Sequence, residues 1–253
     1  MQNDAQIKSH KQKLKLLERF FSIKNSRDNT HKVIVILNIK IAIRNLDTIF
    51  YKFYSDEKKE RLIKKWFKKN TGKELDLKNP QTFNEKIQWL KLYDSTPLKT
   101  RLADKYQVRE WVKEKIGEEY LIPLLGAWDK FEDINFDKLP NQFVLKCNHG
   151  SGYNIIVKDK SKLDLKEARK KINFWMNEDF AFKYGFEMHY SAIPKKIIAE
   201  TFLDEIDNNL YDYRFFCSYG KVLQIWLDIG SGTPEHKRKI YDKDWNELNI
   251  KVK

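Results

Sequence analysis

The chain has 253 residues, of which 41% are hydrophobic and 14% aromatic, enough to fill a core, so an intrinsically disordered protein is excluded. It carries 49 Lys+Arg against 36 Asp+Glu, a formal net charge of +13. This excess attracts nucleotides, nucleic acid, anionic polymers or acidic membrane surfaces without selecting one of them. Two cysteines exclude a disulfide framework and fit a reducing, cytosolic setting, and the five histidines show no metal-ligand spacing.

The N-terminal part contains the most apolar run of the chain. The first residues lack the order of charged, apolar and small segments that marks a signal peptide. The run Val33–Ile43 is interrupted by Asn38 and Lys40. It is also far shorter than the roughly 20 residues that span a bilayer. We therefore expect a helix that docks on the body of the protein or lies at a membrane surface.

Helical signals dominate as far as about Gly117. Ser55 can cap a charged helix, and Thr82 with Glu85 has the spacing of a capping box. After Pro97, apolar residues recur at helical spacing and predict a mostly helical segment that ends at Gly117: Leu102, Val108, Val112 and Ile116.

From Tyr120 onward, short apolar runs bounded by turn residues predict strands. These runs are Phe143–Cys147, Asn154–Val157, Lys196–Leu203, Tyr211–Tyr219 and Val222–Asp228. The last two predict a hairpin that turns near Gly220. One helix intervenes, opened by Asp164 with Glu167 at capping distance. A helical front followed by mostly antiparallel strands predicts an α+β fold.

Three of these strands place charged residues on faces that a sheet normally buries. With a side-chain period of two, the shared faces are Val144 with Lys146, Ile198 with Glu200, and Asp212 with Arg214. Any one of them is compatible with an edge position or a salt bridge. Three together, beside a loop that contains glycines, favour a polar cleft between sheets.

The loop Asn148–Tyr153 matches no common phosphate-binding motif. It lacks the GxxxxGK pattern, and strand-like residues follow it where a GxGxxG turn would open a helix. No GxSxG elbow surrounds Ser151. Gly150 and Gly152 alone are compatible with a tight hairpin or with a phosphate nest. Lys146, immediately before the loop, strengthens the case for the nest.

Several longer segments are similar to a known family. The segments "LKNPQTFNEKIQWLKLYD", "LPNQFVLKCNHGSGYNIIVKDK", "KKIIAETFLD" and "DYRFFCSYGK" closely resemble the TupA-like branch of the ATP-grasp superfamily. The namesake of this branch is a teichuronopeptide biosynthesis protein, and members occur among genes for bacterial surface polysaccharides. The resemblance runs from about Leu77 to the end and is weaker up to about Asn70.

The resemblance implies three parts. Residues 1–95 would form a helical N-terminal region, and residues 96–195 the first ATP-grasp subdomain with its glycine-rich loop. Residues 196–253 would begin the second subdomain, so that antiparallel sheets enclose a nucleotide cleft. ATP-grasp enzymes hold ATP between these subdomains and activate a carboxylate as an acylphosphate, which a nucleophile such as an amine then attacks.

The resemblance also implies roles for residues around the loop. Lys105 and Lys146 would contact the nucleotide phosphates, beneath a glycine-rich flap that supplies Asn148, Gly150, Ser151 and Gly152. Lys146 and Arg214 are the candidate catalytic residues, and Cys147 and His149 have no assigned role. The alternative for Lys105 is an exposed helix position.

Further along the chain, the resemblance places the nucleoside. Glu200 would accept from the adenine amine, while Thr201 and Leu203 would offer backbone groups to the base. Asp212 would bind ribose, and Arg214 would reach phosphate or substrate. Cross-strand pairing of Asp212 with Arg214 is the alternative.

Magnesium is implied together with ATP, but its ligands are not assignable. In this family they follow the segment "IYDKDWNEL"; the ExN spacing that occurs after Glu200, Glu247 with Asn249, begins within that segment and does not follow it. The chain therefore resembles a C-terminally truncated member, in which Asp228 and Asp242 are the remaining acidic alternatives. We expect weak nucleotide binding and slow or no turnover.

The function implied is an ATP-dependent carboxylate–amine or carboxylate–thiol ligase of bacterial cell-surface polysaccharide synthesis. Its partner would be a carboxylated sugar or glycan precursor, and its place the cytoplasm or the inner face of the membrane. The alternatives are an inactive nucleotide-binding remnant, a glycosyltransferase-like protein of a polysaccharide locus, and a basic module for anionic polymers. No DxD-type motif supports the glycosyltransferase, and nucleic acid is disfavoured as a partner.

Overall fold

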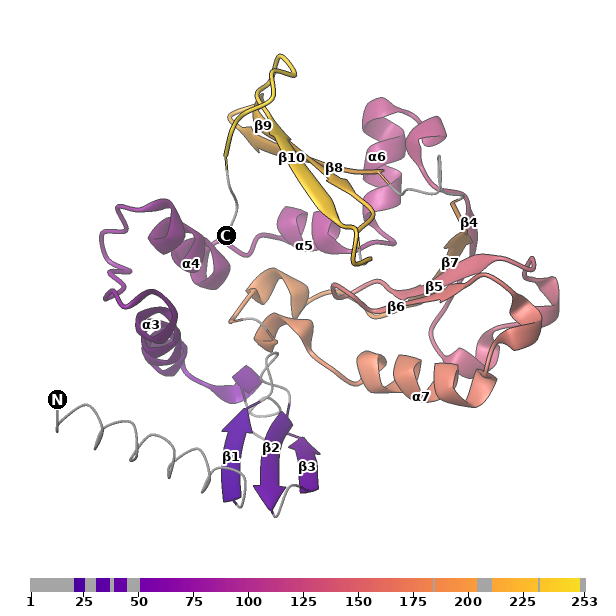
Figure 1. Cartoon of the computed structure of the whole chain (residues 1–253), viewed down its shortest axis with the longest axis horizontal. Coiled ribbons are helices and arrows are strands. Elements are labelled where there is room, and N and C mark those ends of the chain that lie inside the picture. The colour runs from indigo at the N-terminus through magenta and orange to yellow at the C-terminus, as the bar shows by residue number, and fades with distance from the viewer. Residues whose placement is uncertain are drawn as a thin grey trace, which may run out of the picture. The chain divides into compact units, whose positions relative to one another are not determined.

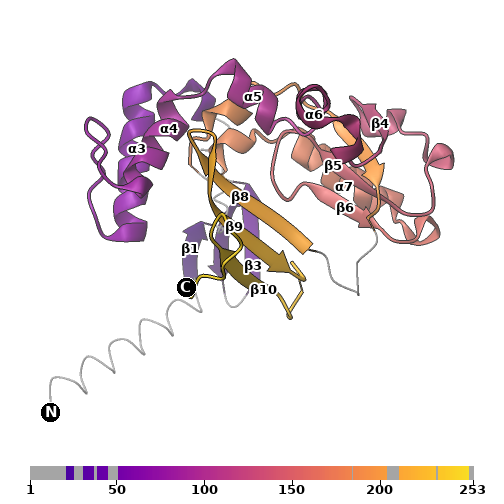
Figure 2. The same ribbon diagram turned by 90° about the horizontal axis from the view of Figure 1, so that it is seen from above.

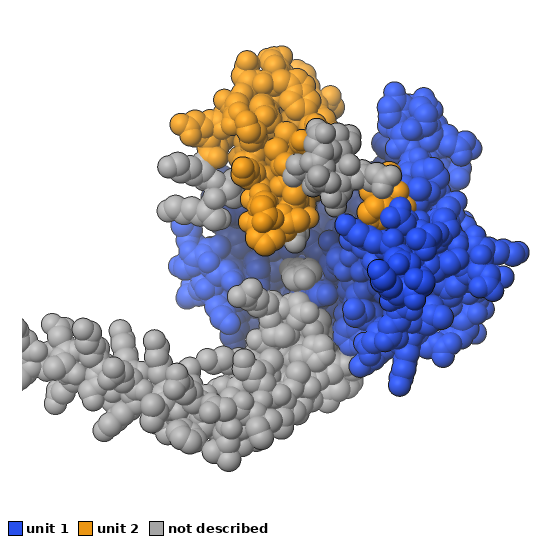
Figure 3. All heavy atoms as spheres, turned by 45° about the vertical axis from the view of Figure 1, so that its right-hand side comes forward, with its two compact units in different colours: residues 1–201 blue, residues 202–253 orange. Residues whose placement is uncertain are grey.

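The computed structural model describes residues 51–183, 185–203, 211–231 and 233–250, together with the backbone of three strands before residue 51. The chain divides into two compact units, residues 1–201 and residues 202–253 (Figure 3). Helices and antiparallel sheets make up the described residues, which confirms the α+β class. None of the helices in these residues is long and apolar enough to cross a bilayer.

The three strands before residue 51 form one antiparallel sheet in the order β1-β2-β3: Phe21–Asn25, His31–Ile36 and Ile39–Arg44. The helix expected over Val33–Ile43 is therefore wrong. Strands β2 and β3 pair with Ile36 opposite Ile39, and the β-branched valines and isoleucines of this run favour extended backbone. Its side chains lie outside the described residues, so docking on the body or on a membrane remains a prediction.

The predicted N-caps of unit 1 are present. Ser55 Oγ accepts from Lys58 N at 3.4 Å, and Thr82 with Glu85 completes the capping box. The segment after Pro97 is divided into two helices because the Asp104 side chain accepts from backbone amides at the next helix start. The α-helices are α3 Asp56–Thr71, α4 Phe83–Tyr93, α5 Pro97–Ala103, α6 Val108–Ile116 and α7 Leu165–Met176. Single 3-10 turns cover Tyr51–Phe53, Glu118–Tyr120, Phe131–Asp133, Phe136–Lys138, Lys160–Lys162, Phe180–Phe182 and Met188–Tyr190.

A four-stranded antiparallel sheet is the centre of unit 1. Its order is β4-β7-β5-β6, with β4 Leu124–Trp128, β5 Phe143–Cys147, β6 Asn154–Val157 and β7 Ile197–Thr201. The sequence patterns predicted β5, β6 and β7 but not β4. Helix α7 runs along one face of this sheet (Figures 1 and 2).

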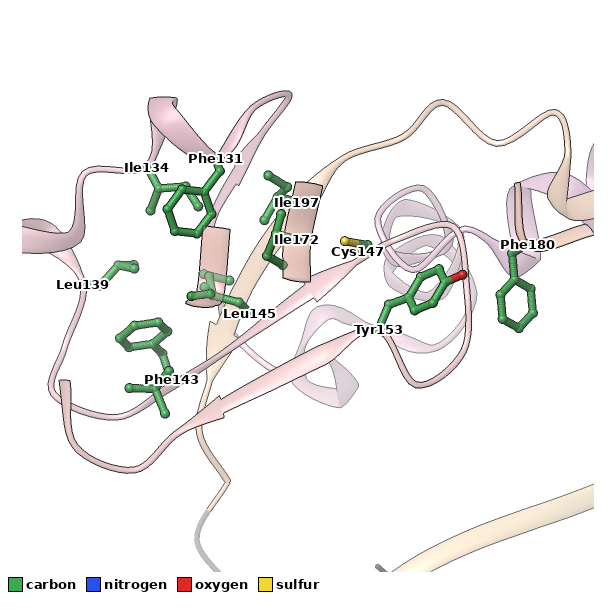
Figure 4. Packing of buried hydrophobic residues seen from close by; sticks show 13 residues of the cluster. Phe131, Ile134, Leu139, Phe143, Leu145, Cys147, Tyr153, Ile172, Phe180 and Ile197 are labelled. Carbon is green, nitrogen blue, oxygen red and sulfur yellow. The ribbon is translucent and has the colours of Figure 1, made fainter. Parts of the chain in front are cut away.

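Alternation along β5 separates a core face from a polar face. Phe143, Leu145 and Cys147 are fully buried, and Figure 4 shows them in the cluster that includes Ile172 of α7. Val144 and Lys146 point to the opposite face, as the period of two predicts. A second cluster joins Ile63 and Phe67 of α3 to the segment 181–186.

Unit 2 contains an antiparallel sheet in the order β10-β9-β8: β8 Tyr211–Ser218, β9 Lys221–Ile229 and β10 Lys237–Tyr241. The predicted hairpin is confirmed, and Gly220 at its turn has φ +72°, a left-handed conformation that favours glycine. Strand β10 was not predicted.

Candidate functional site

A lysine and a glutamate meet on the sheet face opposite α7. In the register of the sheet, Lys146 of β5 lies opposite Ile198 of β7, and Glu200 lies opposite Val144. Lys146 and Glu200 are therefore diagonal neighbours on one face, and Lys146 Nζ donates to Glu200 Oε2. The Glu200 side chain is 8% exposed and that of Lys146 25%, so much of this ion pair is removed from water.

Arg109 of α6 holds the other oxygen of the same carboxylate. Its Nη1 donates to Glu200 Oε1 at 3.1 Å, and its Nη2 donates to the carbonyl oxygen of Ile122 at 2.6 Å. Sequence reasoning missed Arg109, because a single arginine on a charged helix carries no local signal of a distant partner. Two cations thus face one buried carboxylate.

Lys105 brings a third cation to this place. It lies in the turn between α5 and α6, so it is not the exposed helix position that was its alternative. Its Nζ donates to the carbonyl oxygen of Gly150. Burial lowers the pKa of Lys105, and the positive charge of Lys146 lowers this pKa further. The two lysines that the family pattern singles out therefore lie close enough to repel each other.

The two glycines of the loop are required for different reasons. A Cβ on Gly150 would lie 2.5 Å from Cε2 of Tyr153 and 2.9 Å from Cδ2 of Phe180, so packing excludes a side chain. Gly152 has open space around it but a φ of +75°, which favours glycine. Ser151 and Gly152 are exposed at the tip of the loop.

The side chain of Asn148 fixes the start of the loop to other parts of unit 1. It is fully buried, and its Nδ2 donates to Asp104 Oδ1 and to Pro194 O, each at 2.8 Å. Its Oδ1 accepts from Lys196 N at 2.6 Å. These internal bonds employ the donor and acceptor atoms of the Asn148 side chain, and the assignment of Asn148 to the cofactor site stays a prediction.

The far end of the loop is held by aromatic residues. Tyr153 donates its hydroxyl to Glu178 Oε2 at 2.9 Å and stacks on Trp175, with ring centroids 5.4 Å apart.

Burial lowers the pKa of His149 to about 4 and raises the pKa of Cys147 to about 12. At neutral pH both groups are therefore uncharged.

The groups expected beside the base lie at and after the end of β7. The Thr201 amide already donates to Pro123 O at 3.0 Å, so that N–H is occupied by the sheet. Leu203 is half-exposed and belongs to unit 2. Of the backbone groups that Thr201 could offer, its carbonyl oxygen is the better candidate.

Unit 2 has its own charge cluster around a buried carboxylate. Asp228 is fully buried and accepts from Arg238 Nε at 2.7 Å and from His236 Nε2 at 2.6 Å. Arg214 Nε lies 3.1 Å from Asp228 Oδ2, and its Nη2 lies 3.3 Å from Asp212 Oδ2. Arg214 therefore pairs with Asp212 on its own strand and with Asp228 on β9. The sequence signalled neither His236 nor Arg238.

The acidic alternatives for a metal are otherwise engaged. Cations surround Asp228, and Asp242 accepts from the amides of Asp244 and Asn246, both at 2.9 Å. Among the described residues no group of three or more His, Cys, Asp or Glu side chains could hold a metal ion. Asp228 and Asp242 therefore belong to no such group, and the magnesium ligands stay unassigned.

The charged face, the glycine loop and the hairpin all lie within the part of the chain that resembles a known family. A family profile described as TupA-like ATPgrasp matches residues 85–253, about two thirds of the chain. No curated protein and no solved structure was found to match. With its helices, antiparallel sheets and family match, the chain belongs to the TupA-like ATP-grasp family.

Proposed function

We propose that this ATP-grasp protein binds ATP at the unit 1 cluster, defined as Lys105, Arg109, Lys146 and Glu200, and uses it to activate a carboxylate. The observation that supports the proposal is a partly buried surplus of positive charge beside a glycine loop. Three cations and one carboxylate give this cluster a formal charge of +2, which stays positive when the adjacent Asp104 is counted. Such a surplus favours a polyanion over neutral ligands.

Both lysines hold partners that a phosphate can replace. Lys105 is bonded to the Gly150 carbonyl and Lys146 to Glu200. A triphosphate oxygen offers Lys105 a stronger charge-assisted bond than the neutral Gly150 carbonyl does, while Lys146 would exchange one anionic oxygen for another. The backbone amides of the exposed residues Ser151 and Gly152 would add donors to the phosphates. During transfer, the lysines would stabilise the negative charge on the phosphoryl oxygens.

The remaining assignments are parts of the same proposal. Glu200 would accept from the exocyclic amine of adenine through lone pairs that Arg109 and Lys146 leave unused. The carbonyl of Thr201 and the backbone of Leu203 would border the base. Asp212 would bind ribose and Arg214 would reach phosphate or substrate, although in the ligand-free chain both are engaged with each other.

The reaction would be that of a carboxylate ligase. A carboxylate oxygen attacks the γ-phosphorus, ADP leaves, and an acylphosphate results. An amine or thiol then attacks the acyl carbon, and phosphate leaves. Magnesium, when bound, would neutralise phosphate charge, and its ligands are not assigned. The acid would be a carboxylated sugar or glycan precursor of cell-surface polysaccharide, as the resemblance of the sequence implies.

Calorimetric titration with ATP tests the site. Lys146→Met should weaken ATP binding by about tenfold to a hundredfold, because a charge-assisted bond is lost. The matched control is Lys170→Met on α7, whose side chain is 77% exposed. Equal ATP affinity of the wild type and Lys146→Met would remove Lys146 from the site.

Base selectivity tests the adenine assignment separately. A carboxylate that accepts from the adenine amine would face a carbonyl in guanine, so GTP should bind more weakly than ATP. Glu200→Gln, whose amide can donate to that carbonyl, should reduce the preference. If GTP displaces ATP equally well from the wild type, Glu200 does not read the base. ADP release with added magnesium, across carboxylated sugars and amine acceptors, tests the ligase reaction itself.

A further inference from the structure

The Glu200 carboxylate has two cationic partners that differ in how firmly they are held. Arg109 is tied at both ends of its guanidinium, to Glu200 Oε1 at 3.1 Å and to the Ile122 carbonyl at 2.6 Å. Lys146 reaches Glu200 through a flexible stem, and its positive charge is opposed by that of Lys105. The Arg109 side chain is 13% exposed and that of Lys146 25%. Lys146 is therefore the partner that can move.

We propose that Arg109 is a positioning residue that keeps the buried Glu200 carboxylate compensated while Lys146 leaves it for an anionic ligand. The inference rests on the proposed nucleotide site. Without Arg109, the departure of Lys146 would leave a carboxylate of 8% exposure without a cation, and an uncompensated buried charge is strongly disfavoured. The lysine would then remain on Glu200, and the site would lose its phosphate contact.

The anchoring of Arg109 to Ile122 gives this role its geometry. A guanidinium presents its donors in a rigid planar fork, and one branch of the fork is fixed to backbone just before β4. Arg109 therefore cannot follow Lys146 toward a ligand without breaking that bond. A carboxylate held in this way also keeps one orientation, as a group that is to meet the adenine amine requires.

A double-mutant cycle separates compensation from direct contact. The full chain is titrated by calorimetry with ATP and with inorganic tripolyphosphate, in the wild type, Arg109→Met, Glu200→Gln and the double variant. Arg109→Met alone should weaken both ligands by about tenfold, within the usual range of coupled neighbours. In the Glu200→Gln background, where no carboxylate needs a cation, the same change should alter tripolyphosphate affinity by less than about twofold.

The controls address folding and simple loss of charge. Arg169→Met removes an exposed arginine that is paired with Glu132 at 3.3 Å, and it should leave both affinities unchanged. Arg109→Lys keeps the charge but not the planar fork, so it should lose less tripolyphosphate affinity than Arg109→Met does. If Arg109→Met alone does not fold, Arg109→Lys, measured with and without Glu200→Gln, takes its place in the cycle.

The contrary outcomes are distinct. An equal loss of tripolyphosphate affinity in both backgrounds would show that Arg109 contacts the phosphates directly. No loss in either background would show that Glu200 does not need Arg109, and both results overturn the inference while the nucleotide site stands. A wild type that binds neither ATP nor tripolyphosphate would overturn the proposed function and, with it, this inference.

Discussion

Each unit of the chain buries one carboxylate on a sheet face among cations, yet the two clusters differ in charge balance. In unit 1, Glu200 faces Arg109 and Lys146 while Lys105 lies nearby, so positive charge is in excess. In unit 2, Asp212 and Asp228 balance Arg214 and Arg238 before His236 is counted: the pairs are Arg214–Asp212, Arg214–Asp228 and Arg238–Asp228.

A charged residue on a strand face is therefore not by itself the sign of a binding site. The same alternation in sequence places Lys146 on β5 and Arg214 on β8. What differs is how many countercharges the surrounding fold supplies. A self-neutralised cluster stabilises its own sheet, whereas an unbalanced and partly buried one attracts a ligand of opposite charge.

The largest effect that we expect is a difference between the two units in how their stability depends on pH. The pKa of His149 is about 4 in the fold and ordinarily 6.5. Between these values the unfolded chain binds more protons than the folded chain. The contribution of neutral His149 to the free energy of unfolding of unit 1 is therefore complete above about pH 6.5 and falls as the pH drops toward 4. The loss in unit 1 should reach about 3 kcal/mol.

Hydrogen exchange of the β5 and β7 amides over this pH range measures that loss, and His149→Gln should flatten the profile. The amides of β8 and β9 serve as the internal control. A decline of the same size in unit 2, or one that persists in His149→Gln, would show that another group titrates.

Unit 2 should instead depend on Asp228. The hydrogen bond from Arg238 holds the pKa of this carboxyl below its ordinary value of 3.8. The contribution of ionised Asp228 to the stability of unit 2 is therefore complete above pH 3.8 and is lost as the pH falls below this value. Asp228→Asn should cost unit 2 about 2 kcal/mol, reduced from the fully buried case because the partners are partly exposed.

Hydrogen exchange of the β9 amides reads the effect of Asp228→Asn. Asp244→Asn, a change at an exposed turn residue, is the matched control. If both variants exchange alike, the unit 2 cluster contributes nothing to its sheet, and the contrast between the two units fails.

A pair of cation substitutions tests the contrast in binding. Lys105→Met should weaken tripolyphosphate binding by about tenfold, because its charge belongs to the surplus. Arg214→Met should weaken it less, by under about threefold, because Arg214 must first release two aspartates before it reaches a phosphate. Equal losses in calorimetry would mean that its pairing with the aspartates does not weaken its contact with the ligand, and the contrast between the units would fail.

The smallest effects come from two glycines in the same conformation. Gly152 has φ +75° and Gly220 has φ +72°, and neither has a neighbour within 4 Å of an added Cβ. Alanine at either position should cost about 1 kcal/mol of stability for the left-handed backbone. Only Gly152→Ala should also weaken ATP binding. Gly152 lies in the loop that follows Lys146, whereas Gly220 lies in the turn between β8 and β9. Thermal unfolding and calorimetry of both variants check this, and parallel changes in affinity would contradict it.

Much of the local structure could be predicted from the sequence. Helix starts at Ser55, Thr82 and Asp164, the alternation of β5, and the hairpin at Gly220 all agree with the structure. Caps, periodicity and turn glycines act within a few residues, so the chain carries these signals in neighbouring positions. The α+β class followed from the same patterns, and the family from the resemblance of longer segments to known members.

The contacts that form the candidate site were decided only by the tertiary structure. Arg109 meets Glu200 across 91 positions of sequence, and Lys105 meets Gly150 across 45. The burial of Asn148 and its bond to Asp104, 44 positions away, arise in the same way. Such outcomes depend on which elements pack together, because ion pairs and burial act through space, and local propensity does not encode them. The pairing that makes Val33–Ile43 part of a sheet is decided between strands for the same reason.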